Sequence, residues 1–222
     1  NRLIVLFLDD YHVRRENAMR IREQLAVFLS QLSPHDLVAI ATPFSSVAGI
    51  TLSRSHIGLA NHVLNFEGRK FDYIPRNAIE ERYQNLPIEQ QERMRNSIVI
   101  GALANISEYL GTLREGRKTI LYVSEGMSGT LPAGVTVKTP LGLGRVRTDV
   151  PGNGRESVPF FETATLLNDL QNRVFQTAAR NNVSIYTLDA RGLASFEYDL
   201  GDTVSEADDR RLAQETADLL RV

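Results

Sequence analysis

Short apolar runs alternate along the chain with longer amphipathic segments. The runs are rich in β-branched residues and end in polar or acidic residues, which is typical of strands covered on both faces of a parallel sheet. They predict strands at 3–8, 36–42, 119–123 and 183–188. A weaker apolar stretch, 47–52, follows the second run after a short link and favours an antiparallel strand at a sheet edge.

The segments between these runs have apolar residues at helical spacing, and several of them end at Pro or Gly. This pattern predicts helices at about 16–32, 56–65, 78–83, 87–113, 163–181 and 206–220. Strands that alternate with helices imply a mainly parallel α/β sheet with right-handed crossovers.

Two segments have loop character. The stretch 67–77 is polar and has no clear period, and 127–160 holds six of the 15 Gly and four of the eight Pro. Loops of that length are uncommon unless they are functional. Because 222 residues suit a single core, we expect one domain with insertions at about 67–86 and 127–160.

Composition narrows the function classes. Lys and Arg number 25 against 27 Asp and Glu, so no overall field attracts nucleic acid, and we expect no nucleic-acid partner. The absence of Cys removes thiolate nucleophiles and thiolate metal sites. The longest apolar run, 3–8, is far shorter than the ~20 residues that span a bilayer, so we expect no transmembrane segment in this chain.

Acidic residues follow three of the predicted strands. Asp9 and Asp10 come after the first, Glu125 after 119–123, and Asp189 after the last. Ligands of parallel sheets bind beyond the carboxyl ends of the strands, and grouped carboxylates there suit a hard divalent cation. The alternative is that these acids cap helices or remain solvated.

A tract of basic and aromatic residues between 69 and 95 is a second candidate binding surface, because Arg and aromatic side chains are enriched at interface hot spots. Nearby acids balance its charge, however, which favours a solvated face with internal ion pairs over a binding surface. The basic members are Arg69, Lys70, Arg76, Arg82, Arg93 and Arg95, and the aromatic ones are Phe71, Tyr73 and Tyr83.

Several motifs carry a family resemblance. The stretches 6–9 (Leu-Phe-Leu-Asp), 36–42 and 116–126 (ending Val-Ser-Glu-Gly) resemble the von Willebrand factor A (VWFA) domain. The chain resembles the bacterial VWFA-related domain proteins more closely. Three stretches carry this resemblance: 8–13 (Leu-Asp-Asp-Tyr-His-Val), 73–77 (Tyr-Ile-Pro-Arg-Asn) and 184–192 (Ser-Ile-Tyr-Thr-Leu-Asp-Ala-Arg-Gly).

The resemblance implies a Rossmann-like three-layer α/β/α fold, with a mainly parallel sheet and an antiparallel edge strand. It covers residues 1–222 as a single VWFA-like domain. No sixth strand follows the last predicted helix, so either the domain continues past Val222 or it is truncated before a last strand.

The family usually binds proteins through a metal-ion-dependent adhesion site, formed by Asp-x-Ser-x-Ser after the first strand, a distal Thr and an Asp after the fourth. Asp9 matches the first Asp, but Tyr11 and Val13 stand in place of the two Ser. Glu125 follows Ser124 where Thr-Asp-Gly is usual. The resemblance therefore implies a degenerate site with Asp9 and Glu125 as the remaining ligands for a divalent cation, and no other cofactor.

The resulting hypothesis is a non-catalytic, adhesion-type protein interaction module whose protein partner is unknown. The residues expected at its contact centre are Asp9, Asp10, His12, Arg76 and Glu125. The resemblance also implies an exported protein, periplasmic, envelope-bound or secreted.

Two alternatives stay open. One is a metal-assisted hydrolase in which a bound ion activates water, held by Asp9, Asp10, His12, Glu125 and Asp189. The other is a structural scaffold domain whose loops only pack.

Overall fold

The computed structural model describes residues 2–113, 116–128, 134–145 and 168–192, together with 131, 165, 166 and 214. At its centre lies a four-stranded sheet in the order β2-β1-β3-β6. The strands are β1 (Arg2–Leu8), β2 (Leu37–Ala41), β3 (Arg117–Ser124) and β6 (Val183–Asp189). All three strand pairs are parallel, so the four carboxyl ends share one edge. The predicted α/β class with a parallel sheet is confirmed.

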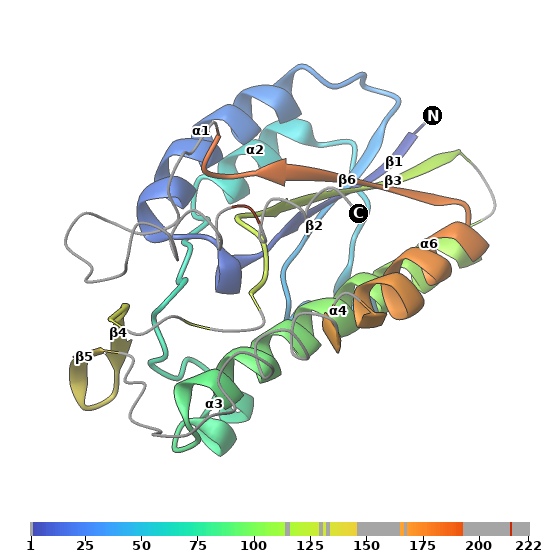
Figure 1. Cartoon of the computed structure of the whole chain (residues 1–222). Helices are drawn as coiled ribbons and strands as arrows, with labels where there is room; N and C mark the ends of the chain where they lie inside the picture. Colours follow the sequence, from blue (N-terminus) through green and yellow to red (C-terminus); the bar gives the residue numbers. More distant parts are fainter. Residues whose placement is uncertain are drawn as a thin grey trace.

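Helices cover both faces of this sheet (Figure 1). On one face lie α1 (Arg15–Ser30) and α2 (His56–Val63), and on the other lie α4 (Ile88–Thr112), the π-helical segment η3 (Leu170–Phe175) and α6 (Gln176–Arg180). This arrangement is compatible with a three-layer α/β fold.

The central strand β1 is buried from Leu3 to Leu8 because its side chains contribute to two apolar cores, one on each face of the sheet. Its alternate side chains point to opposite faces. Val5 and Phe7 pack in the core with residues of α4, while Leu6 and Leu8 pack in the core with residues of α1. The continuous apolar run is thus the signature of a two-sided burial.

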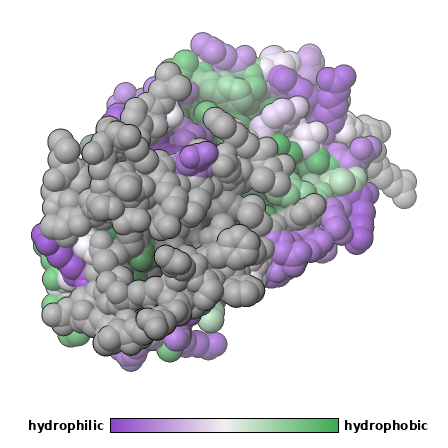
Figure 2. All heavy atoms as spheres, viewed as in Figure 1, coloured by the Kyte–Doolittle hydropathy of each residue, from purple (hydrophilic) through white to green (hydrophobic). Residues whose placement is uncertain are grey.

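Some large apolar side chains remain exposed on the α1 and α2 layer, among them Met19, Val27 and Ile57. Figure 2 shows hydrophobic residues among hydrophilic ones on this side of the molecule. Exposed apolar residues are ordinary on soluble surfaces, so this layer does not define a docking face.

The expectation of a strand at 47–52 is wrong. The segment forms a short 3-10 helix, η2 (Val47–Gly49), and only a single antiparallel bridge joins Val38 to Ser53, with N···O distances of 2.9 and 2.8 Å. Between 47 and 52 only Ile50 is buried. One buried side chain does not provide the alternating pattern that holds a strand against a core.

The prediction of a continuous loop over 127–160 is also wrong in part. Residues 134–145 contain a hairpin of β4 (Thr136–Thr139) and β5 (Gly142–Arg145). Gly142 has a φ of +111°, a conformation that L side chains rarely adopt, and this permits the turn. Residues 146–160 lie outside the described residues.

The 67–77 stretch is irregular, as expected, and leads to α3 (Ala78–Tyr83). The side chain of Asn77 caps α3 by accepting from the backbone N–H groups of Ile79 and Glu80, both at 3.0 Å. The loop is tied to the hairpin, because Lys138 N–H donates to Phe71 O at 2.9 Å and Tyr73 N–H donates to Lys138 O at 2.8 Å.

The remaining predicted helices agree with the structure to different degrees. The predicted helices at 16–32, 56–65 and 87–113 match α1, α2 and α4 to within a few residues. The predicted helix at 163–181 is described at 165, 166 and from 168 on, and its segment 170–175 is π-helical before α6. The predicted helix at 206–220 lies almost wholly outside the described residues. Within the described part of the chain, no helix combines the length and apolar content needed to cross a bilayer.

Candidate functional site

The polar residues predicted to gather beyond β1 and β3 do so at the carboxyl edge of the sheet, in two separate sets of contacts. The chain leaves β1 at Asp9 and enters a 3-10 turn, η1 (Asp10–His12). Asp9 accepts from the backbone N–H of His12 at 3.3 Å and so begins this turn. Glu125 follows β3 and donates its own N–H to His12 O at 3.0 Å, which joins the two loops.

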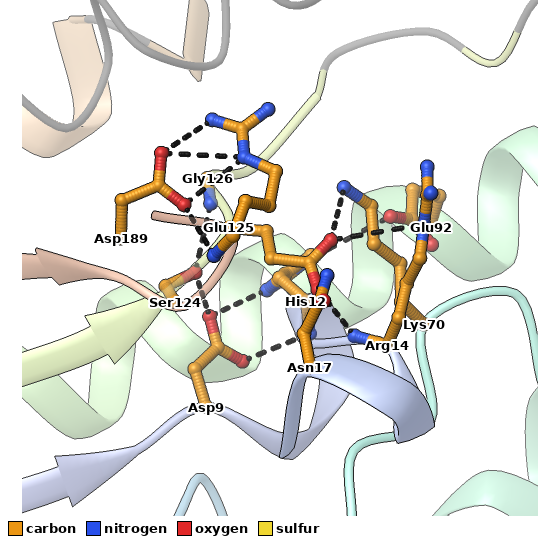
Figure 3. Close-up of polar contacts among 11 residues, drawn as sticks. Asp9, His12, Arg14, Asn17, Lys70, Glu92, Ser124, Glu125, Gly126 and Asp189 are labelled. Carbon is orange, nitrogen blue, oxygen red and sulfur yellow. Dashed lines mark hydrogen bonds and ion pairs between the residues drawn. The ribbon is translucent and has the colours of Figure 1, made fainter. Parts of the chain in front are cut away.

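Asp9 is the centre of the first set and is fully buried. Its Oδ2 atom accepts from His12 Nδ1 at 2.8 Å and from the Ser124 hydroxyl at 2.9 Å (Figure 3). The same oxygen accepts from the Tyr122 hydroxyl at 2.7 Å. Burial alone would raise the pKa of Asp9, but the charge of His12 and these hydrogen bonds outweigh it and lower the pKa. Asp9 is therefore an ionised, internally paired carboxylate.

His12 is equally buried. Burial opposes its charge, yet Asp9, together with Glu92, raises its pKa above the usual value. Its second ring nitrogen, Nε2, lies 3.7 Å from Glu92 Oε1 and has no hydrogen-bond partner among the described residues. The buried imidazole thus lies between two carboxylates, which favour its charged form.

Glu125 is also fully buried and is held from the opposite side of the turn. Its Oε1 atom accepts from Arg14 N at 2.7 Å and from Asn17 Nδ2 at 2.8 Å. Its Oε2 atom lies 3.4 Å from Lys70 Nζ and 3.8 Å from Arg14 Nε. Figure 3 shows Lys70, Arg14 and Asn17 gathered around this carboxylate. Glu125 therefore fixes the start of α1 and balances two basic side chains.

The second set is built around Arg69, which is 3% exposed. Its Nε atom donates to Asp10 Oδ2 at 2.8 Å, and its two terminal nitrogens donate to the two carboxylate oxygens of Glu80. The Tyr11 hydroxyl donates to Glu80 Oε1 at 2.6 Å. Burial would raise the pKa of Glu80, but the hydrogen bonds from Arg69, Tyr11 and the Arg76 amide lower it to about 2.

The Arg76 side chain and Asp189 stand apart from both sets. The Arg76 side chain is 48% exposed and lies 3.9 Å from Glu67 and 3.8 Å from Asp72. Asp189 accepts hydrogen bonds from the backbone N–H of Arg191 at 2.9 Å and from its guanidinium group at 2.7 to 3.2 Å. The side chains of the hydrolase alternative therefore lie in four different groups of contacts: Asp9 with His12, then Glu125, Asp10 and Asp189.

Asp9 and Glu125 do not converge on a common point in the way that metal ligands do. Each accepts hydrogen bonds from its own group of protein donors. Among the residues that the structure describes, no three His, Asp or Glu side chains are grouped closely enough to hold a metal ion. What the arrangement does show is that each candidate ligand already has a basic side chain against it.

An open cavity of about 480 Å³ lies beside Glu125, between the start of α1, the 67–77 loop and the β4–β5 hairpin. Arg14 and Lys70, which contact Glu125, are among its lining residues, and so is the exposed Arg76. Among the residues that the structure describes, those around this cavity give an external molecule access to the edge.

Three further residues that line this cavity, Arg14, Arg15 and Lys138, were not among those predicted at the contact centre. The Arg-Arg pair directly before a predicted helix was a usable signal, since the first turn of that helix sits near the strand ends. Lys138 lies in the stretch 127–160, which was predicted to be a loop, so the hairpin that positions its side chain was not foreseen.

In sequence comparisons, no protein-family model and no curated protein matches this chain. The fold and the site therefore define a class only: an α/β protein of Rossmann-like architecture, with a buried polar network and an open cavity at the carboxyl edge of its parallel sheet.

Proposed function

We propose that this chain is a VWFA-like, non-catalytic interaction module that binds a protein partner at the carboxyl edge of its sheet without a metal ion. The VWFA assignment comes from the motif resemblance, and the four parallel strands in the order β2-β1-β3-β6 with helices on both faces are compatible with it. The same resemblance is the basis for proposing an exported protein.

The contacts of Glu125 carry this proposal. The resemblance assigns Glu125 and Asp9 to the metal, but Lys70 and Arg14 lie against Glu125, and His12 lies against Asp9. A divalent cation bound there would lie close to these positive charges, or would have to displace buried side chains. The built-in cations thus take over the neutralising role that a metal has in a standard adhesion site.

The exposed fraction of each candidate side chain indicates which of them can contact a partner. Asp9, His12 and Glu125 are each 0% exposed, so in this conformation they support the edge from inside and cannot contact a partner. Arg76 and the cavity beside it are accessible. Loops held by a rigid scaffold are common binding surfaces. We therefore assign partner contact to the rim of this cavity, which includes Arg76.

The test is site-specific photocrosslinking of the whole chain in an extract of its own cells. A photoreactive benzoylphenylalanine replaces Arg76 at the rim, and the matched control replaces Arg117, an exposed residue at the start of β3 and hence at the opposite edge. We expect a discrete crosslinked protein from position 76 only, at equal yield with and without EDTA. Equal labelling from both positions, or loss of the product in EDTA, would refute the proposal.

A further inference from the structure

The β4–β5 hairpin carries an open strand edge. Its two strands form a small sheet of their own, separate from the four-stranded sheet (Figure 1). On one side, a parallel bridge between Asp72 and Lys138 joins β4 to the 67–77 loop. On the other side, no strand of the described part of the chain pairs with the outer side of β5. This outer side is therefore an edge of the small sheet.

The hydrogen bonds of Lys138 determine which backbone groups of β5 point to this edge. Lys138 N–H donates to Phe71 O at 2.9 Å and Lys138 O accepts from Tyr73 N–H at 2.8 Å, so both groups of Lys138 point away from β5. Pairs along an antiparallel ladder alternate between hydrogen-bonded and non-hydrogen-bonded ones, and Lys138 lies opposite Leu143. Leu143 is consequently in a non-hydrogen-bonded pair, and its N–H and C=O groups point to the open edge.

The side chains at this edge are apolar or absent. Leu143 is 75% exposed, and Leu141 in the turn is 100% exposed. Leu143 stands between two glycines: a Cβ atom at Gly142 would meet nothing within 4 Å, and one at Gly144 would meet Val137 Cγ2 at 4.0 Å. Glycine inside a strand often marks a site where another backbone approaches closely. The edge thus has room for a second backbone and offers one apolar side chain.

The hairpin is held in place by the rest of the chain. Val137 packs in a small apolar cluster with Tyr73, and the Tyr73 hydroxyl donates to Glu92 Oε2 of α4 at 2.7 Å. In the turn, Thr139 Oγ1 donates to Gly142 O at 3.0 Å. A segment that is already fixed loses little conformational entropy on binding, so β5 is prepared to receive a ligand.

The unpaired backbone groups select the class of ligand. A lipid bilayer would accept the side chains of Leu141 and Leu143 but would leave N–H and C=O groups without partners. A second copy that paired β5 with β5 would join strands of four residues, whereas a stable interface uses about 20 to 30 residues a side. An extended segment of another protein supplies backbone partners, and it can continue along the cavity that Leu143 also lines.

We propose that the outer edge of β5 binds an extended segment of the partner protein by strand addition. The segment exchanges backbone hydrogen bonds with Leu143, and one of its apolar side chains packs on the Leu143 side chain. This inference rests on the proposed function and adds the mode of binding and the chemistry of the partner segment.

The test uses a short, end-capped peptide that alternates Val with Thr. One matched peptide has the same side chains but methylated backbone nitrogens, and a second has Ser in place of Val. Leu143→Pro removes the outward N–H, a change that edge strands tolerate, and Leu143→Ser keeps this N–H but removes the apolar side chain. Ile57→Ser, at a residue of α2 that is also 75% exposed, is the control. Circular dichroism first checks that each variant is folded.

We expect the Val peptide to slow amide hydrogen exchange at Leu143 and to leave Gly144, whose N–H points to β4, unchanged. Loss of two or three backbone hydrogen bonds should weaken the methylated peptide by about tenfold or more. The Ser peptide and Leu143→Ser should also weaken binding, Leu143→Pro should abolish it, and Ile57→Ser should retain it. High salt should have little effect, because the contact is not between charges.

No binding of the Val peptide, equal binding of the methylated peptide, unchanged exchange at Leu143, or full binding by Leu143→Pro would each overturn the inference. Self-association of the parent chain that Leu143→Pro abolishes would overturn it in favour of a second copy. A protein crosslinked at position 76 whose binding is unaffected by Leu143→Pro would leave the proposed function standing and overturn this inference alone.

Discussion

His12 and Asp9 form a pair in which neither side chain is exposed and His12 Nδ1 lies 2.8 Å from Asp9 Oδ2. In the folded chain the pKa of His12 is raised and that of Asp9 is lowered. The stabilisation from His12 is present below its unfolded pKa of about 6.5 and is lost as the pH rises through the raised value. The stabilisation from Asp9 is present above about 3.8 and is lost as the pH falls through the lowered value.

His12→Gln therefore tests the pair through its pH dependence. Removing one member of a buried ion pair leaves the other charge uncompensated, so we expect a loss of about 3 kcal/mol in the free energy of unfolding near about pH 6. The difference from the parent chain should shrink as the pH rises through the raised pKa of His12. Urea denaturation at several pH values measures both. The exposed His35→Gln is the matched control, and a pH-independent difference would contradict the ion-pair description.

Tyr11→Phe tests the second set of contacts with little change in shape. The substitution removes the hydroxyl that donates to Glu80 at 2.6 Å but keeps the ring, which lies under the guanidinium groups of Arg69 and Arg95. A hydrogen bond to a charged group contributes about 1.5 to 3 kcal/mol, and we expect a loss in that range. Thermal unfolding measures it. Tyr186→Phe, in a side chain that is 60% exposed, should change little, and an equal effect of the two would exclude the hydrogen bond as the cause.

At the scale of elements, the 67–77 loop packs directly on η1 and so connects the two polar sets. Arg69 N–H donates to Asp10 O at 2.7 Å and Lys70 N–H donates to Val13 O at 3.0 Å. The approach is close because Gly68 has no side chain, and a Cβ atom there would lie 2.2 Å from Val13 O. The contact of Lys70 with Glu125 depends on this approach.

Gly68→Ala should consequently separate the loop from η1. Since the obstructing atom belongs to the backbone, it cannot move aside easily, and we expect a loss of about 1 to 3 kcal/mol in stability. Chemical denaturation gives the value. Gly49→Ala is the control, because a Cβ at position 49 meets nothing within 4 Å. A Gly68→Ala protein as stable as the Gly49→Ala protein would show that the close approach is not required.

The elements that the sequence predicted well are those with long, continuous patterns. The run at 3–8 and the amphipathic stretch at 87–113 became β1 and α4, since burial on two faces and helical spacing are strong signals. The predictions for 47–52 and for the hairpin at 136–145 were wrong because the sequence patterns there are short. The apolar stretch 47–52 was read as a strand, but only Ile50 in it is buried. The two glycines of β5 made its sequence typical of a loop.

The site was predictable only in its location. Asp9 and Glu125 were placed correctly at the carboxyl edge, because both follow parallel strands. Their partners were not predictable. Lys70 is 55 residues from Glu125 and Arg69 is 59 residues from Asp10 in the sequence, and no local pattern specifies contacts over such separations. The burial of His12 was not predictable either: this residue was predicted at the contact centre, and its side chain is 0% exposed.

For the whole molecule, the internal pairing of Asp9 and Glu125 predicts an unfolding temperature that does not depend on divalent cations. A ligand that binds the folded state raises the melting temperature by mass action. We expect no shift for metal-stripped protein in ~1 mM Mg²⁺, Ca²⁺, Mn²⁺ or Zn²⁺, measured by differential scanning calorimetry. A shift in the parent chain that disappears in Glu125→Gln would restore the metal site. Glu89→Gln, in the first turn of α4, controls for general effects of removing a charge.

The central position of β1 affects how the molecule responds to mechanical force. The strand is hydrogen-bonded to β2 on one side and to β3 on the other, in parallel register along its length. A pulling force applied at Arg2 along the strand axis loads both ladders in shear, so their hydrogen bonds share the load and must rupture together. A domain attached to its surroundings through β1 would thus hold its shape under tension while the rim at the other end of the same strand remained available for binding.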